Sequence, residues 1–380
     1  MSESVSVRSA LKQHNGVIRL MEAHDPVSSD IVRNFQIQGN GFQGLWVSGL
    51  TQTTHLGIPD TEIITPLLRA TLLAATLKSG SPGDRKLCAA FDADSGGDIP
   101  SIPALVRILN SMGVSMIVIE DKDLHAPGEK VNSLLPADGS QAQANPHEFA
   151  RKIHTFIRET YGTEIMITAR IESFNTRIVM DDPEEDAASV RNALADALSR
   201  AEIYTDAGAD AVMIHSKSKD PDEVLEFIRA FRAKNPHIPV VVVPTTYSTT
   251  PRQTLIDAGA NVIIYANHLM RAKIKGVHKV AKAQLEINPA LFADNEEARA
   301  SLDAQNYGSL LRVLKKMDFE NGKNAEAMTF YVAAKQRAIS SMARATLELL
   351  LGDKSGCEAD SLMITVKDLL KINSYEVGQL

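Results

Sequence analysis

The chain has 380 residues, 44% of them apolar, and a formal net charge of −7 at pH 7. This length and apolar content allow a large hydrophobic core, and the acidic balance argues against a nucleic-acid-binding surface, which would need a basic face. The two cysteines, Cys88 and Cys357, form no CxxC pair, so neither a zinc framework nor a disulfide scaffold is predicted. The chain lacks an apolar run of about 18 residues, and its N-terminal segment lacks the apolar core of a signal peptide. We therefore expect a cytoplasmic protein that binds no membrane.

Short apolar runs typical of buried strands alternate along the chain with longer amphipathic stretches typical of helices. Eight strands are predicted, at Val17–Met21, Leu45–Ser48, Leu87–Phe91, Ser115–Ile119, Glu164–Ala169, Ala211–Ile214, Ile238–Val243 and Val262–Tyr265. Helices are predicted between them, for example at Pro59–Lys78, Ile102–Met112, Pro146–Tyr161, Ala187–Thr205, Pro221–Ala233 and Pro251–Ala258. Eight strands that alternate with helices favour an α/β fold, the (β/α)8 or TIM barrel, over an open doubly wound sheet. The absence of a GxGxxG fingerprint agrees with this choice.

The pattern changes past Leu285, where the strand signal ends and polar, helical sequence follows. Ala325–Leu351 is predicted to form a long helix with an apolar stripe, which needs a surface to pack on. We therefore predict a catalytic barrel over residues 1–285 and a helical C-terminal extension over residues 286–380. The terminal segment of this extension is expected to pack on the barrel or on a partner subunit.

Polar side chains follow most of the predicted strands, at the point where each strand ends. In a (β/α)8 barrel these positions line the active site. They are Glu22, His24, Ser48, Gly49, Asp92, Asp94, Glu120, Asp121, Lys122, Arg170, Glu172, His215, Thr245, Thr246 and Asn267. Several carboxylates, an arginine and a histidine at one end of many strands indicate a functional site.

Three of these carboxylates, Asp92, Asp94 and Glu120, are predicted to converge. Like charges in one pocket are unfavourable unless a cation shares it. All-oxygen ligands suit Mg2+, or alternatively Mn2+, rather than zinc. Such an ion keeps positions for water and for an anionic substrate.

Other strand-end residues allow two interpretations each. Arg170 offers a bidentate fork for a carboxylate or phosphoryl group, or it pairs with Glu172 or with the carboxylates. His215 is an oxyanion donor or a base, or a core histidine. Gly49 begins a small-residue turn whose N–H groups could bind an anion, or a simple tight turn. Asp60 is placed by the pattern in the first turn of a helix, where an acidic residue is ordinary.

The ordered motifs resemble those of the phosphoenolpyruvate mutase branch of the isocitrate lyase superfamily, over roughly residues 15–285. They are RLMEAHDPVSS at 19–29, LWVSGL at 45–50, GIPD at 57–60, FDADSG at 91–96, EDK at 120–122, KVNS at 130–133, ARIES at 169–173 and AVMIHSKS at 211–218. A short segment, Met363–Leu370, also resembles the end of the family's sequences.

The resemblance implies a role for each matching position. Asp92 corresponds to the direct Mg2+ ligand, with Asp94 and Glu120 reaching the ion through water. Arg170 and His215 correspond to contacts of the phosphoryl group, and Asp60 to the family's essential acidic residue. The substrate's carboxylate end is expected at Trp46, Ser48, Gly49 and Leu50, with Lys122 in the same signature. Lys130, Asn132 and Ser133 correspond to a gating loop that closes over the substrate.

The gating loop separates the branches of the superfamily. The carbon–carbon lyases are similar to one another in carrying a cysteine there, whereas this chain has Glu129–Ser133 without one. Phosphonopyruvate hydrolase tends to have threonine where this chain has Asn132. The resemblance thus implies a Mg2+-dependent phosphoenolpyruvate phosphomutase, an isomerase that makes phosphonopyruvate. The hydrolase and a lyase of 2-hydroxy or 2-methyl dicarboxylates remain as alternatives.

Two features depart from the family pattern. The spacer Asp123–Glu129 is longer, which puts the size of the lid and the substrate scope in question, and about 75 residues separate the barrel from the terminal segment. A homotetramer or homodimer with helix exchange is implied by the resemblance.

Overall fold

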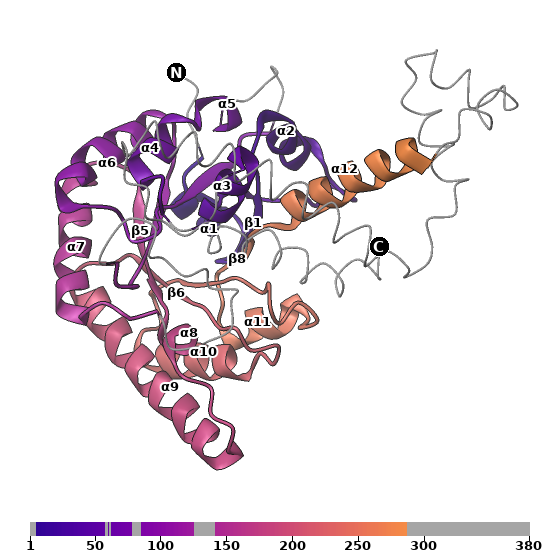
Figure 1. Ribbon diagram of the computed structural model, residues 1–380. Coiled ribbons are helices and arrows are strands. Elements are labelled where there is room, and N and C mark those ends of the chain that lie inside the picture. Colours follow the sequence, from indigo (N-terminus) through magenta and orange to yellow (C-terminus); the bar gives the residue numbers. More distant parts are fainter. Residues whose placement is uncertain (1–4, 58–59, 61, 78–84, 125–140, 287–380) are drawn as a thin grey trace, which may run out of the picture. The chain divides into compact units, whose positions relative to one another are not determined.

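The computed structural model describes residues 5–57, 60, 62–77, 85–124 and 141–286. Eight strands, all paired in parallel, close into a barrel in sequence order (Figure 1). They are β1 (Ile18–Glu22), β2 (Gly44–Val47), β3 (Cys88–Asp92), β4 (Met116–Glu120), β5 (Met166–Ile171), β6 (Ala211–Ile214), β7 (Val240–Val242) and β8 (Val262–Tyr265). The predicted (β/α)8 barrel is confirmed, and every predicted strand lies within about two residues of the observed one.

Helices connect the strands and cover the outside of the barrel, as Figure 1 shows for α6, α7 and α9. The helical elements are α1 (Val7–Gln13), α2 (Pro26–Asn34), α3 (Gly49–Leu56), α4 (Pro66–Thr71), α5 (Ala74–Leu77), the 3-10 turn η1 (Ile99–Ser101), α6 (Ile102–Ser111), α7 (Pro146–Glu159), α8 (Ser173–Thr176), α9 (Pro183–Asp206), α10 (Asp222–Lys234), α11 (Arg252–Ala258) and α12 (His268–Glu286). Proline in the first turn and a capping side chain before it begin several of them, as Asn145 does for α7.

The segment between β2 and β3 differs from the prediction. The prediction of a single helix at Pro59–Lys78 is wrong. Two shorter helices, α4 and α5, lie in this range, and α3, which was not predicted, comes before them. Gly57 ends α3 in the left-handed region, with φ of +74°, and the Thr65 side chain caps the start of α4. Asp60 therefore lies in a bend between helices and is buried, not in the first turn of a helix.

Alternate residues of the strands fill the interior of the barrel, as the period of two in a strand requires. Ile18, Leu20, Trp46, Ala90 and Val118 belong to this inner cluster. Val7 and Ala10 of α1 join it, and the backbone N–H of Val7 donates to the Ser115 hydroxyl just before β4. Helix α1 thus covers the end of the barrel at which the strands begin.

The other strand residues face outward and pack under the helices. Leu45, Phe91 and Ile119 lie in this second cluster with Leu105 of α6 and Phe156 of α7. Fully burying side chains of this size contributes roughly 1.5–3 kcal/mol each, so the barrel is held from inside and from outside.

Contacts divide the chain into two units, Met1–Leu269 with Ile364–Leu380, and Met270–Met363. Most of the second unit, including the predicted helix Ala325–Leu351, lies outside the described residues, so the extent of the barrel and of its extension stays a prediction. In the part of the chain that the structure describes, no helix has the length and apolar character needed to cross a membrane.

Gly44 in β2 provides a test of the inner packing. A Cβ at this position would lie 2.4 Å from Leu20 Cδ2 and 2.5 Å from Cys88 Sγ. We predict that Gly44→Ala lowers the free energy of unfolding by about 1–3 kcal/mol, because the packed interior cannot make room without strain. Urea unfolding followed by the fluorescence of Trp46, the single tryptophan, measures this in the barrel itself.

Gly276 in α12 is the matched control, since a Cβ there meets nothing within 4 Å. Gly276→Ala is expected to leave the midpoint unchanged or slightly higher. An equal loss in both variants would contradict the packing argument.

Candidate active site

Three of the charged residues predicted at the strand ends face the interior at the carboxyl end of the barrel. Asp92 ends β3, Glu120 ends β4 and Arg170 is the penultimate residue of β5. Each continues the row of inward-facing residues on its strand, as Ala90 and Val118 do. The register of β4 and β5 sets Glu120 directly beside Arg170.

Four of these side chains form a buried ion cluster, here named the Arg170 cluster: Glu120, Lys122, Arg170 and Glu172. Arg170 Nη1 lies 3.2 Å from Glu120 Oε2, and Arg170 Nε pairs with Glu172 Oε1. Lys122 Nζ lies 3.6 Å from Glu120 Oε2 and 3.9 Å from Glu172 Oε2. Two cations thus balance two carboxylates. Of the two interpretations of Arg170, the structure shows the one in which it pairs with carboxylates.

The pKa shifts in the Arg170 cluster follow from this pairing. Burial alone would lower the pKa of Arg170, but Glu172 and Glu120 raise it above its ordinary value. Burial would raise the pKa of Glu172, but Arg170 and Lys122 bring it below its ordinary value. In both groups the ion pairs outweigh burial and favour the charged form, so the cluster presents fixed charges.

His215 follows β6 and is buried beside the Arg170 cluster. Asn175 Nδ2 lies 2.7 Å from Glu172 Oε2 and 2.6 Å from His215 Nδ1. Because a carboxylate only accepts hydrogen bonds, the Asn175 amide donates to both, and His215 carries its proton on Nε2. Burial, and then the charge of Arg170, lower the pKa of His215 to about 3. His215 is therefore a neutral N–H donor at physiological pH.

The carboxylates after β3 are organised by a residue that sequence reasoning missed. Arg69 of α4 pairs with Asp94 Oδ2, and its Nη2 donates to the backbone oxygen of Asp92 at 2.6 Å. Arg69 is fully buried. Its only local signal is an arginine in the apolar run Pro66–Ala70, which does not reveal a partner 25 positions away.

Gly49 begins α3 beside the same carboxylates. Its backbone N–H donates to Asp92 Oδ2 at 3.2 Å, and a Cβ there would lie 2.7 Å from Asp94 Oδ1. Only glycine allows this close approach. The N–H group expected to bind a substrate anion thus contacts Asp92 in this structure.

Asp92, Asp94 and Glu120 are not drawn together into one compact ligand set. Among the described residues, a different group, His24, Asp25 and His55, brings three such ligand atoms within 4.8 Å of one another. Asp94 is paired with Arg69, and Glu120 with Arg170 and Lys122. Their part in holding an ion therefore stays a prediction.

The residues expected around the substrate's carboxylate end lie next to Asp92. Trp46 faces the barrel interior, Ser48 is the residue before α3, and Leu50 lies in its first turn; all three are buried. Lys130, Asn132 and Ser133 lie outside the described residues.

The described residues on either side of positions 125–140 are fastened together. The backbone N–H of Asp123 donates to Ala142 O at 2.9 Å, and that of Ala144 donates to Asp121 O at 2.7 Å. The Asp121 carboxylate accepts from the Tyr204 hydroxyl at 2.7 Å, although burial raises the pKa of Asp121 to about 6. Both ends of the predicted gating loop therefore begin from a fixed base on β4 and α9.

A closed (β/α)8 barrel with fixed cations, carboxylates and a neutral histidine at the carboxyl end of its strands defines an enzyme barrel for a small anionic substrate. The family model for phosphoenolpyruvate phosphomutase matches residues 7–285. The chain therefore belongs to the phosphoenolpyruvate phosphomutase family.

Individual relatives agree with this assignment. A phosphoenolpyruvate phosphomutase of Tetrahymena pyriformis is 32% identical over 265 residues, which cover 69% of this chain and 77% of that protein. The crystal structure of a phosphoenolpyruvate phosphomutase from Streptomyces platensis subsp. rosaceus matches with a TM-score of 0.61 and 29% identity, over 81% of this chain and 96% of the other. A phosphonopyruvate hydrolase in complex with oxalate and Mg2+ matches with a TM-score of 0.58 and 22% identity, over 83% and 100%, which shows the shared fold. The predicted family and enzyme class are confirmed.

The protonation of His215 is a direct test of the site. We predict that its ring stays neutral with the proton on Nε2 from pH 8 down to about pH 4, because burial and Arg170 oppose the charged form. Since an ordinary histidine titrates near 6.5, His215 favours the folded state fully above that pH, and this contribution is lost as the pH falls toward 3. Nitrogen NMR of the imidazole ring measures both the titration and the tautomer.

His215→Gln assigns the signal, and Asn175→Ala removes the donor to Nδ1. The latter is expected to change the balance of tautomers without charging the ring at neutral pH. A His215 titration midpoint near 6.5 in the unmodified chain would contradict the assignment.

Proposed function

We propose that this protein is a phosphoenolpyruvate phosphomutase that interconverts phosphoenolpyruvate and phosphonopyruvate. In the forward direction the bond between phosphorus and the enol oxygen breaks, and a bond between phosphorus and C3 of the same molecule forms. The enol oxygen becomes the keto oxygen of phosphonopyruvate. Atoms and electrons balance within the substrate, so the reaction needs no proton donor.

The observation that carries this proposal is the pairing of a fixed cation with a neutral donor at neighbouring strand ends. Arg170 is held charged by Glu172 and Glu120, and His215 presents Nε2–H without titrating near neutral pH. Phosphoryl transfer requires positioning and charge stabilisation of a loose transition state rather than acid–base work. Arg170 and His215 would hold the phosphoryl oxygens while the group moves from oxygen to carbon.

A divalent cation would complete the charge balance, and Mg2+ is proposed, with Mn2+ as the alternative. The all-oxygen donor set suits such an ion, and the resemblance to the family implies Asp92 as the direct ligand, with Asp94 and Glu120 reaching the ion through water. When bound, the ion would supply Lewis-acid stabilisation to the enolate and carboxylate oxygens of the substrate.

The remaining residues would position the substrate and exclude water. Trp46 forms a wall at the barrel interior, and Ser48, Gly49 and Leu50 surround the carboxylate end. Asp60, buried between α3 and α4, lies in the bend that follows the same helix. Lys122, Lys130, Asn132 and Ser133 are proposed to belong to the closing loop and its base. A dry site prevents capture of the phosphoryl group by water.

Phosphonopyruvate hydrolysis is the second candidate, because one matched structure is a phosphonopyruvate hydrolase. It would use the same binding groups and admit water. Carbon–carbon cleavage is less well supported, because the loop motif Glu129–Ser133 has no cysteine. Cys88 does not replace it, because it is buried within β3 and burial raises its pKa to about 12.

A homotetramer or homodimer with exchange of C-terminal helices is proposed from the resemblance to the superfamily.

Phosphorus NMR of the products distinguishes the candidate functions. We predict that the chain, incubated with phosphonopyruvate and Mg2+, forms phosphoenolpyruvate, because the reverse reaction runs toward the more stable side. Inorganic phosphate would instead identify a hydrolase, and unchanged phosphonopyruvate would rule out both.

Asp92→Asn tests the metal assignment. It is expected to abolish Mg2+-dependent turnover, and retained activity would contradict Asp92 as the direct ligand.

Asn132→Thr tests whether the loop decides between rearrangement and hydrolysis. We predict a several-fold larger share of inorganic phosphate among the products, because threonine would no longer position the phosphoryl group away from water. The same NMR assay measures the ratio of the two products. Asn110→Thr on the exposed surface of α6 is the matched control, and an unchanged ratio in Asn132→Thr would remove this basis for choosing the mutase.

A further inference from the structure

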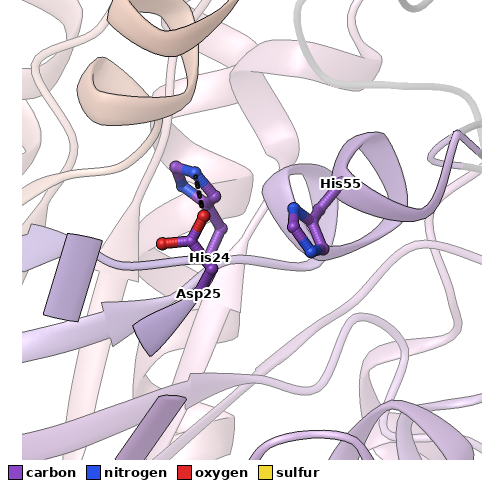
Figure 2. Close-up of side chains that lie close together, drawn as sticks. All are labelled: His24, Asp25 and His55. Atoms are coloured by element: carbon purple, nitrogen blue, oxygen red, sulfur yellow. Dashed lines mark ion pairs between the residues drawn. The ribbon is translucent and has the colours of Figure 1, made fainter. Parts of the chain in front are cut away.

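A second group of potential metal ligands has no role in the chemistry proposed above. His24 and Asp25 follow β1, and His55 lies in the last turn of α3. Figure 2 shows the ring of His55 on the side of its helix that faces His24 and Asp25. One ligand atom from each of the three side chains lies within 4.8 Å of the other two. The group joins two segments that are separated in sequence by β2.

Glu22, the last residue of β1, determines which ring nitrogen of His24 carries a proton. His24 Nδ1 lies 2.5 Å from Glu22 Oε1, and both side chains are buried. Because a carboxylate at this distance accepts, Nδ1 carries a proton, and in the neutral ring Nε2 then offers its lone pair to a metal ion. Carboxylate–histidine pairs of this kind orient metal-binding histidines and increase their basicity.

The lone pair of His24 Nε2 faces another acceptor. Asp25 Oδ2 lies 3.4 Å from Nε2 (Figure 2). Asp25 Oδ1 caps α2 by accepting from the backbone N–H of Ser28 at 2.8 Å, which fixes the carboxylate with Oδ2 toward His24. Two acceptors held face to face require either a second proton on His24 or a cation between them.

The spacing suits a tetrahedral metal ion. Bonds of about 2.0–2.1 Å from zinc to nitrogen and oxygen separate neighbouring ligand atoms by about 3.4 Å, which is the distance between His24 Nε2 and Asp25 Oδ2. His55 is exposed and its ring centroid is 5.8 Å from that of His24. Its ligand nitrogen lies within 4.8 Å of the other two ligand atoms, so ion binding would move this exposed side chain toward the two ligands that are buried or capped.

We propose that His24, Asp25 and His55 bind a divalent transition-metal ion of the zinc type, with water in the fourth position. Two imidazoles and one carboxylate select such an ion over Mg2+, which prefers oxygen ligands alone. The site shares no ligand with the one proposed at Asp92, and His55 lies at the other end of α3 from Gly49, which contacts Asp92. His55 is six residues from Gly49, or about 9 Å along the helix axis. The bound ion would tie the end of α3 to the segment after β1 and so brace the helix whose first turn contacts Asp92.

Cobalt titration of the full chain tests this site without reference to catalysis. The protein, stripped of metal with a chelator, is titrated with Co2+ in excess Mg2+, which occupies oxygen-only sites. We expect one equivalent of Co2+ with the strong visible absorption of four- or five-coordinate nitrogen ligation, displaced by one equivalent of Zn2+. His55→Gln is expected to weaken binding by more than tenfold, and Glu22→Gln by about 10–100-fold through His24.

His154→Gln is the matched control, because His154 is an exposed histidine on another helix, α7. It is expected to bind Co2+ as the unmodified chain does, and circular dichroism checks that each variant is folded. Absence of the visible band in the unmodified chain would overturn the proposal and assign a second proton to His24. Equal affinity in His55→Gln and the unmodified chain would overturn it as well. The phosphonopyruvate assay does not enter this test, so the two proposals fail independently.

Discussion

The structure of the site depends on the need to balance charge inside a closed barrel. Glu120, Lys122 and Glu172 are buried and Arg170 is mostly so, and a lone charge there would cost several kcal/mol. Arg170 lies between Glu120 and Glu172, and Lys122 approaches both carboxylates. The parallel register of β4 and β5 makes this pairing possible, because it sets Glu120 beside Arg170. The ends of the strands therefore form a rigid set of charges that balance one another.

Helices outside the barrel hold the strand ends through arginine–aspartate pairs. Arg69 of α4 pairs with Asp94, which follows β3, and Arg200 of α9 pairs with Asp121, which follows β4. Asn175 of α8 also holds strand-end residues in place, since its amide donates to both Glu172 and His215. Preorganised groups of this kind need little rearrangement during a reaction, and this is the main source of electrostatic catalysis.

Helix α3 connects the two sites for which ions are proposed. Its first residue contacts Asp92, the proposed oxygen ligand, and its last turn carries His55, a proposed nitrogen ligand. Different donor atoms would keep hard and borderline ions apart. The N-capping geometry of α2 and the Glu22–His24 pair would hold the proposed ligands Asp25 and His24 in place before any ion binds.

The sequence by itself determined the barrel, because eight buried strands reveal themselves by short apolar runs and by the polar residues that follow them. It also identified the family and the strand-end residues Asp92, Glu120, Arg170 and His215, since a parallel barrel places the ends of all strands together. The sequence did not predict the division of the segment after β2 into α3, α4 and α5. Gly57 ends α3 and Thr65 caps the start of α4, and these caps leave little trace in the apolar pattern. Only the tertiary structure decided the pairs of Arg69 with Asp94, Asn175 with His215, and His55 with His24. Local patterns record which face of an element is buried, whereas these pairs join elements far apart in the chain and exist only once the barrel has closed.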